Sequence, residues 1–241
     1  MTEYTPTTFV LIHGAWHGGW VWQTLAEHLR QQGHRVYTPT LTGLGERSHL
    51  LNESITLETF ITDIVNLFKW ENLNDVVLLG HSFGGLVVSG VADRIPESIR
   101  QLIFLDGFLV ENGQSPFDTL PVKAVEKLKN IATTQCNGLA LPSPRPVLLG
   151  YPDDEKTTET ISDLLTPHPI GTYASKLELH HPLGNYLPVT YYKCTNPAYD
   201  PVAPSHVLAK KQQGWSIVKL PTSHAAPFTH PHLLADLLLS F

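Results

Sequence analysis

The sequence predicts an α/β fold in which a mostly parallel, six-stranded sheet carries helices on both faces. Three observations support this prediction. Short apolar runs alternate along the chain with stretches of helical periodicity, the pattern of a parallel sheet covered on two sides. One apolar run leads directly into Gly80-His81-Ser82-Phe83-Gly84, which is typical of a tight strand-to-helix turn. The 241 residues, 42% of them hydrophobic, suit one such domain with a substantial core.

The strands are expected at apolar or β-branched runs, six in all. They are residues 9–12, 35–38, 76–79, 102–105, 189–194 and 215–220. Helices are expected between them, at residues 20–32, 56–69, 86–92 and 231–239. Gly33 marks the end of the first helix. In the second, Leu57, Phe60 and Ile64 recur at helical spacing, which predicts one buried face.

Ser82 is the predicted nucleophile. It lies at the centre of a G-x-S-x-G pentapeptide between the apolar run Val76–Leu79 and an apolar stretch that can begin a helix. In such a nucleophile elbow the central residue adopts a strained backbone, and flanking glycines remove Cβ atoms that would collide with the strand and helix. The serine hydroxyl then stands at the carboxyl edge of the sheet.

A serine needs a base to take its proton, and His224 is the predicted base. It lies in a loop between the expected last strand and the C-terminal helix. In elbow-type hydrolases the order along the chain is serine, acid, histidine, so the base is expected in this place.

The acid should lie between Ser82 and His224. We assign it to Asp200, which ends the proline-rich loop after the strand 189–194, where its carboxylate could orient the imidazole. Asp106, at the end of the strand 102–105, is the alternative acid.

Backbone amides are the expected donors of an oxyanion hole. One is the amide of Phe83, directly after the nucleophile. The other is assigned to Ala15, in the glycine-rich loop 13–20 that follows the first strand. His13 and His17 in that loop are expected to shape it through hydrogen bonds.

Three motifs together resemble the α/β-hydrolase superfamily, in the branch of plant methylesterases, hydroxynitrile lyases and bacterial, pyrethroid-hydrolase-like carboxylesterases. They are His13-Gly14-Ala15-x-His17-Gly18-Gly19-Trp20, Gly80-His81-Ser82-x-Gly84-Gly85 and Ser223-His224-Ala225. The resemblance spans nearly the whole chain and is weakest between about residues 111 and 187. The amino-terminal hairpin of larger members is expected to be missing.

The resemblance implies an esterase. Hydroxynitrile lyases of this branch carry a threonine and a lysine where this chain has Gly14 and Ala225. Neither residue supplies a hydroxyl or a cation for cyanide chemistry. The acid loop also departs from the family's pattern, since Asn196-Pro197-Ala198-Tyr199 contains no second acidic residue.

The predicted reaction is hydrolysis of a small, hydrophobic carboxylic ester through an acyl-enzyme intermediate. Alternatives left open are hydroxynitrile lyase-type chemistry, cleavage of a C–N or C–C bond, and a small-molecule receptor with incidental hydrolysis. We expect no cofactor and no metal, because paired histidines such as His180-His181 have no further ligands to complete a tetrahedral set.

The segment 108–188 is predicted to form a cap over Ser82, with residues 1–107 and 189–241 forming the hydrolase core. The alternation of strands and helices lapses there, prolines are frequent, and short helices are expected at 121–130 and 155–165. Phe108 and Tyr173 from the cap, with Trp16 from the oxyanion loop, are the expected substrate-binding residues. Phe117, Leu120, Leu148, Tyr151 and Ile170 are further candidates.

Composition indicates the partners and the compartment. A net charge of −6 argues against a nucleic-acid partner. No apolar run is long enough for a membrane span, and the first six residues carry no secretory signal. With two cysteines, a reducing, cytoplasmic setting is expected. The expected partner is a small ester substrate, and a homodimer is one assembly that the sequence leaves open.

Overall fold

The computed structural model describes residues 6–241. The expected lack of a secretory signal rests on the first residues of the chain and falls outside the described part. Within residues 6–241, none of the helices combines the length and the apolar character that crossing a membrane requires.

Six strands form one sheet, with the order β2-β1-β3-β4-β7-β8, and every neighbouring pair in it is parallel. The strands are β1 (Thr8–Ile12), β2 (Arg35–Tyr37), β3 (Val76–His81), β4 (Ile99–Leu105), β7 (Val189–Cys194) and β8 (Ser216–Leu220). All six coincide with predicted runs, so the predicted six-stranded sheet is confirmed. Because the strands are parallel, their carboxyl ends meet at a single edge.

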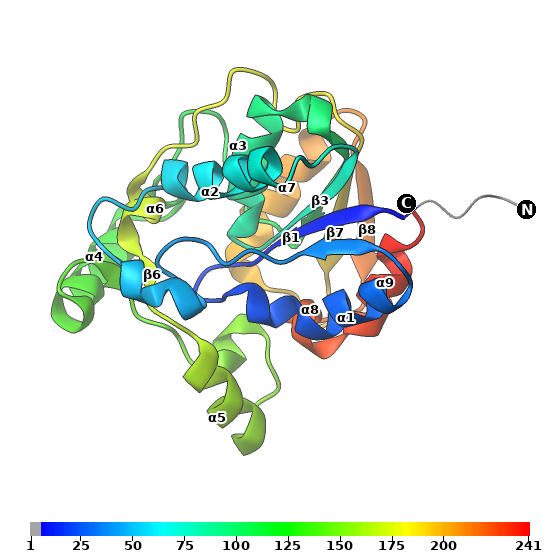
Figure 1. Cartoon of the computed structure of the whole chain (residues 1–241). Helices are drawn as coiled ribbons and strands as arrows, with labels where there is room; N and C mark the ends of the chain where they lie inside the picture. The colour runs from blue at the N-terminus through cyan, green and yellow to red at the C-terminus, as the bar shows by residue number, and fades with distance from the viewer. Residues whose placement is uncertain (1–5) are drawn as a thin grey trace, which may run out of the picture.

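Helices cover both faces of the sheet (Figure 1). The helices of the core are α1 (Gln23–Gln31), α2 (Leu57–Trp70), α3 (Gly84–Arg94), α7 (Ala203–Lys211), α8 (Ala226–Thr229) and α9 (Pro231–Leu238). Helices α1 and α9 pack on one face, while α2, α3 and α7 pack on the other. The prediction of helices on both faces is confirmed.

Side chains of each strand alternate between two cores, as the pleat of a strand requires. In β1, Phe9 and Leu11 pack with α1 and α9, whereas Val10 and Ile12 pack with α2 and α3. Since both faces of the sheet are buried, the inner strands are continuous apolar runs. These runs made the inner strands predictable from the sequence.

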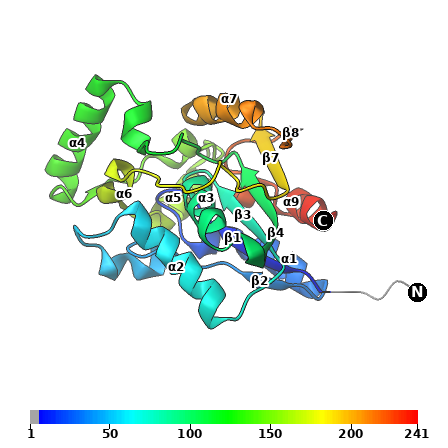
Figure 2. The ribbon, with the colours of Figure 1, turned by 90° about the horizontal axis from the view of Figure 1, so that it is seen from above.

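The segment between β4 and β7 contains three helices and a two-stranded antiparallel sheet. These are α4 (Val122–Cys136), β5 (Ala140–Leu141), α5 (Glu155–Leu164), β6 (His168–Pro169) and α6 (Ile170–Ala174). Figures 1 and 2 place α4 and α6 at the end of the molecule away from the C-terminus, and in Figure 1 α5 projects from the bottom of the molecule. The two ends of the segment between β4 and β7 pack into the core that contains α2 and α3, through Leu109, Val110, Leu177 and Leu179.

Several elements differ from the prediction. Helix α4 runs six residues further than expected, to Cys136, and the small sheet and α6 were not predicted. The most consequential difference is helix α7, which was not predicted. The sequence 203–211 contains a proline and lacks a clear apolar stripe, so it did not indicate a helix. Its Pro204 lies in the first turn, where a proline needs no hydrogen bond and does not interrupt the helix.

Candidate active site

Ser82 follows β3 in a strained turn. Its φ of +52° lies in the left-handed region, which a residue with a side chain adopts only when its surroundings require it. The Ser82 carbonyl accepts hydrogen bonds from the N–H groups of Gly85, at 2.9 Å, and Phe108, at 2.7 Å. A Cβ at Gly84 would lie 2.8 Å from the carbonyl oxygens of Ile12 and His13. The turn therefore has the geometry of a nucleophile elbow.

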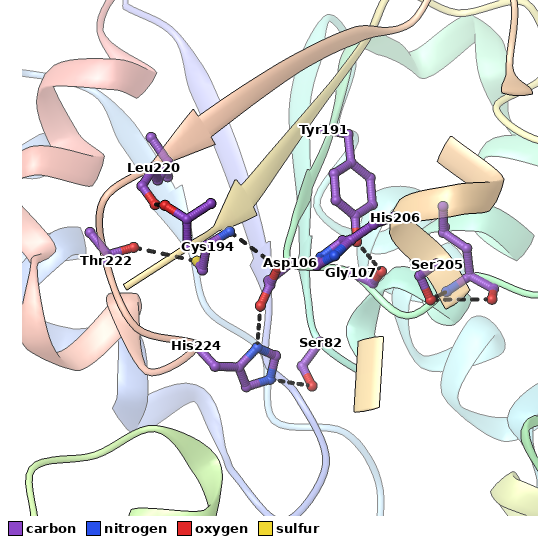
Figure 3. Close-up of polar contacts among 12 residues, drawn as sticks. Ser82, Asp106, Gly107, Tyr191, Cys194, Ser205, His206, Leu220, Thr222 and His224 are labelled. Atoms are coloured by element: carbon purple, nitrogen blue, oxygen red, sulfur yellow. Dashed lines mark hydrogen bonds and ion pairs between the residues drawn. The ribbon is translucent and has the colours of Figure 1, made fainter. Parts of the chain in front are cut away.

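His224 lies against Ser82, in the loop between β8 and α8. The Ser82 hydroxyl donates to His224 Nε2 at 2.9 Å, and the imidazole is 3% exposed. On its other side, His224 Nδ1–H donates to Asp106 Oδ2 at 2.7 Å (Figure 3). Three side chains from distant parts of the sequence thus form one continuous hydrogen-bonded chain.

The assignment of Asp200 as the partner of His224 is wrong. Asp200 begins a 3-10 turn (Asp200–Val202) and its side chain is exposed, whereas Asp106 is fully buried and bonded to the imidazole. The alternative acid named from the sequence, Asp106, has the predicted geometry.

Strand order explains this outcome. Strand β4 lies next to β3 in the sheet, so Asp106 at the end of β4 emerges beside Ser82 at the end of β3. The Asp106 N–H donates to the Tyr192 carbonyl at 2.7 Å, and Asp106 has a φ of +46°. This conformation, which aspartate tolerates better than most residues, turns the chain at the end of β4.

Tyr199, which precedes Asp200 in the loop after β7, packs on the face of the His224 ring. Its ring stacks on the His224 imidazole, with ring centroids 3.9 Å apart and an angle of 19° between the planes. On another side, His81 Nε2–H donates to the His224 carbonyl at 2.8 Å. The loop after β7 therefore contributes an aromatic face to the site instead of a carboxylate.

Three donors surround the Asp106 carboxylate. Besides His224, they are His206 Nε2–H, 2.8 Å from Oδ1, and the Cys194 N–H, 3.2 Å from the same oxygen. Burial opposes ionisation, but the hydrogen bonds from His206 and His224 outweigh it and lower the pKa of Asp106 to about 2. Asp106 is thus an anion at neutral pH. The sequence analysis missed His206 because it did not predict α7.

The loop after β1 lies directly against Ser82, since a Cβ at Gly14 would come within 2.8 Å of the Ser82 Cβ. His13 and His17 shape this loop as predicted: their Nδ1–H groups donate to the carbonyls of Gly14 and Ala15 at 2.8 and 2.7 Å. Within residues 6–241 the N–H groups of Ala15 and Phe83 have no acceptor in the chain. Both amides are therefore available to a ligand.

Four histidines around the site are buried and neutral. Burial lowers the pKa of His13 to about 4 and that of His17 to about 3. It also places the pKa values of His81 and His168 well below the ordinary one. In His13, His17 and His168 one ring nitrogen donates a hydrogen bond and the other accepts one, as suits a neutral imidazole; His17 Nε2, for example, accepts from the Tyr151 hydroxyl at 2.8 Å. His81 donates through Nε2 to the His224 carbonyl, and its buried Nδ1 has no partner within residues 6–241.

A cavity of about 190 Å³ opens beside Ser82. The predicted residues Trp16, Phe108 and Tyr173 all line it, as does Leu120. No charged side chain lines it. The full lining is Trp16, Ser82, Phe83, Phe108, Pro116, Leu120, Leu128, Leu141, Tyr173, Tyr199, Pro201 and Val202. Of the other candidates, Phe117 packs behind Tyr173, and Leu148 is 63% exposed.

No group of three or more His, Cys, Asp or Glu side chains within the described part of the chain is arranged to hold a metal ion.

Comparison with known proteins identifies the family of this chain. Residues 9–237 match the model of the alpha/beta hydrolase family. A carbendazim hydrolyzing esterase from Nocardioides sp. is 37% identical, over 95% of this chain and 97% of that protein. A putative chloroplastic methylesterase from Arabidopsis thaliana is 38% identical, over 46% of this chain and 32% of the plant protein. The latter match therefore spans about a third of that relative.

Solved structures show the same fold. An extracellular alpha/beta-hydrolase from a Paenibacillus species superposes with a TM-score of 0.81 at 26% identity, and the match covers 98% of each chain. A pyrethroid hydrolase superposes with a TM-score of 0.78 at 23% identity, over 98% of each chain.

The chain belongs to the alpha/beta hydrolase family. More particularly, it is a carboxylesterase-type hydrolase in the branch that the sequence motifs indicated.

The buried histidines predict that the protein loses stability in mild acid. In the unfolded chain His13 and His17 take up protons below pH 6.5, but in the folded protein they do so only near pH 4 and 3. The unfolded state therefore binds more protons in this window, and stability falls as the pH falls. Between pH 7.5 and pH 5 each histidine should cost about 2 kcal/mol of unfolding free energy, measured by urea denaturation.

The variant His17→Gln provides the control, because it removes one of these protonations. Its loss between the two pH values should be smaller by about 2 kcal/mol. Equal unfolding free energies of the native sequence at pH 7.5 and pH 5 would contradict the assignment of neutral, buried imidazoles.

Proposed function

We propose that the protein hydrolyses small, uncharged carboxylic esters by acyl transfer through Ser82, with His224 as the base and Asp106 as the acid that orients it. The observation that carries the proposal is the hydrogen-bonded chain from Ser82 Oγ through the His224 ring to Asp106 Oδ2, with links of 2.9 and 2.7 Å. Nucleophile, base and orienting acid are the arrangement that acyl transfer by a serine requires.

In the first step Ser82 Oγ attacks the ester carbonyl carbon while His224 Nε2 takes the hydroxyl proton. The resulting imidazolium is stabilised by the Asp106 carboxylate, which accepts from Nδ1–H. His224 then gives its proton to the leaving alkoxide as the C–O bond breaks. A water molecule, deprotonated by His224, then attacks the acyl-enzyme carbonyl. The carboxylic acid is released and Ser82 regains its proton from His224.

The free N–H groups of Ala15 and Phe83 are assigned to the oxyanion. Phe83 follows the nucleophile at the start of α3, and Ala15 lies in the loop that closely approaches Ser82. Donors fixed in this way stabilise the negative charge of the tetrahedral intermediate by roughly 3 kcal/mol each.

The cavity supports a small, apolar substrate. Its volume of about 190 Å³ is below the roughly 300–1,000 Å³ of most ligand clefts, and its aromatic and aliphatic lining offers no partner for a charged group. The 108–188 segment acts as a cap in this proposal, because Phe108, Pro116, Leu120, Leu128, Leu141 and Tyr173 all come from it. Carbendazim, for which the Nocardioides relative is named, is a methyl carbamate, and it should be assayed beside the carboxylic esters as a separate substrate class.

Replacement of Ser82 tests the nucleophile. Ser82→Ala should lower kcat/KM for p-nitrophenyl acetate by about 10⁴-fold or more, because no attacking oxygen remains. Ser223→Ala is the matched control, since the Ser223 hydroxyl is buried without a hydrogen-bond partner. Retention of a tenth of the rate in Ser82→Ala would exclude this mechanism. For the protein with its native sequence, faster cleavage of mandelonitrile than of the ester would favour hydroxynitrile lyase chemistry. Release of product from a single turnover only would favour a small-molecule receptor.

A pair of variants tests the acid. Asp106→Asn should lower kcat/KM by about 10⁴-fold, because an amide can present its N–H group to His224 and favour the wrong tautomer. Asp200→Asn should change it less than about twofold, since the Asp200 side chain is exposed and substitutions of exposed side chains have small effects. Circular dichroism establishes that both variants are folded. The opposite ranking would return the acid to Asp200.

The cavity predicts a preference for short acyl groups. The kcat/KM for p-nitrophenyl octanoate should be at least about tenfold below that for the butyrate, because the longer chain exceeds the available space. Leu128→Ala enlarges the cavity and should move this ratio about fivefold or more toward the octanoate. Leu148→Ala is the control at an exposed leucine. A ratio unchanged by Leu128→Ala would show that the acyl group lies elsewhere.

A further inference from the structure

Two histidines share the Asp106 carboxylate, and the proposed acyl transfer uses only one of them. His224 takes Oδ2, while His206 Nε2–H donates to Oδ1 at 2.8 Å (Figure 3). The His206 side chain is 6% exposed and Asp106 is not exposed at all. A buried imidazole bound to a buried carboxylate is a costly arrangement, so the role of His206 calls for an explanation.

The fold holds His206 rigidly. It lies on α7, one residue after Ser205, whose hydroxyl accepts from the Leu109 N–H at 2.9 Å and ties the helix to the chain after β4. The His206 ring packs in a T-shaped arrangement with the ring of Tyr191 on β7, with centroids 5.7 Å apart and an angle of 85° between the planes. The Tyr191 hydroxyl in turn donates to the Gly107 carbonyl at 2.7 Å. His206 is therefore fixed between β7 and the residues that follow Asp106.

His206 is the titratable donor to Asp106 that lies outside the proposed triad. Cys194, Tyr191 and Tyr199 also face the carboxylate, and burial raises the pKa of each of them, so they stay neutral. His81 faces His224, and its lowered pKa keeps it neutral as well. Among these groups, His206 alone gives the carboxylate a side-chain hydrogen bond that competes with the one from His224.

We propose that His206 is a positioning residue of the hydrolase site: its hydrogen bond to Oδ1 aims Oδ2 at His224 and weakens Asp106 as an acceptor toward that imidazole. The inference rests on the proposed function, because it requires His224 to be the base. Without the donor, Asp106 would hold the protonated form of His224 more strongly. The base would then become neutral, and hence active, only at a higher pH.

Two variants of His206 test this inference. His206→Leu fills the space without a donor, and His206→Gln places an amide N–H near the position of Nε2. The measurement is kcat/KM for p-nitrophenyl acetate between pH 5 and 9, with the melting temperature as a check on folding. In His206→Leu the plateau should fall about tenfold or more, and the midpoint of the acid limb should rise by about half a pH unit or more. His206→Gln should restore the midpoint and most of the rate.

The pH midpoint separates this role from a merely structural one. A structural role would lower the rate or the melting temperature without moving the midpoint, and that outcome would overturn the inference. So would a midpoint in His206→Gln as displaced as in His206→Leu. If His206→Leu does not fold, His206→Asn, whose shorter side chain cannot reach Asp106, takes its place. Full activity of Ser82→Ala would instead show that the proposed function itself had failed.

Discussion

One buried carboxylate joins four parts of this protein at a single point. Asp106 ends β4, and its oxygens accept from the backbone of β7, from His206 on α7 and from His224 after β8. Desolvating a charge at such a depth is tolerated only when its lone pairs are satisfied. The three donors supply that satisfaction, and in doing so they fix the imidazole that faces Ser82.

The backbone is strained at the edge of the sheet where Ser82 and Asp106 lie. Ser82 and Asp106 both have positive φ, and each ends one of two adjacent parallel strands. The chain leaves the sheet there so abruptly that hydroxyl and carboxylate emerge side by side, and the amides that hold the Ser82 carbonyl come from the two turns themselves. Strain of this kind is stable because the surrounding sheet over-determines it.

Two parts of the chain line the cavity beside Ser82. The core supplies the polar groups, while the 108–188 segment supplies most of the apolar walls. This division fits a hydrolase in which the sheet positions the reacting groups and a separate segment shapes the space beside them. The neutral histidines His13 and His17, in the glycine-rich loop 13–20, add no charge to this environment.

The sequence by itself predicted the six strands, the tight turn at Ser82 and His224 as the candidate base, because these predictions rest on local patterns: apolar runs, glycine spacing and chain order. For the orienting acid it favoured Asp200 over Asp106. Both follow a strand and both lie before His224, and local patterns do not show which strand lies beside β3. Only the tertiary structure decided this, by placing β4 beside β3 and turning Asp200 to solvent. His206 was invisible for the same reason, because its partner lies 100 residues away along the chain and only the packing of α7 brings the two together.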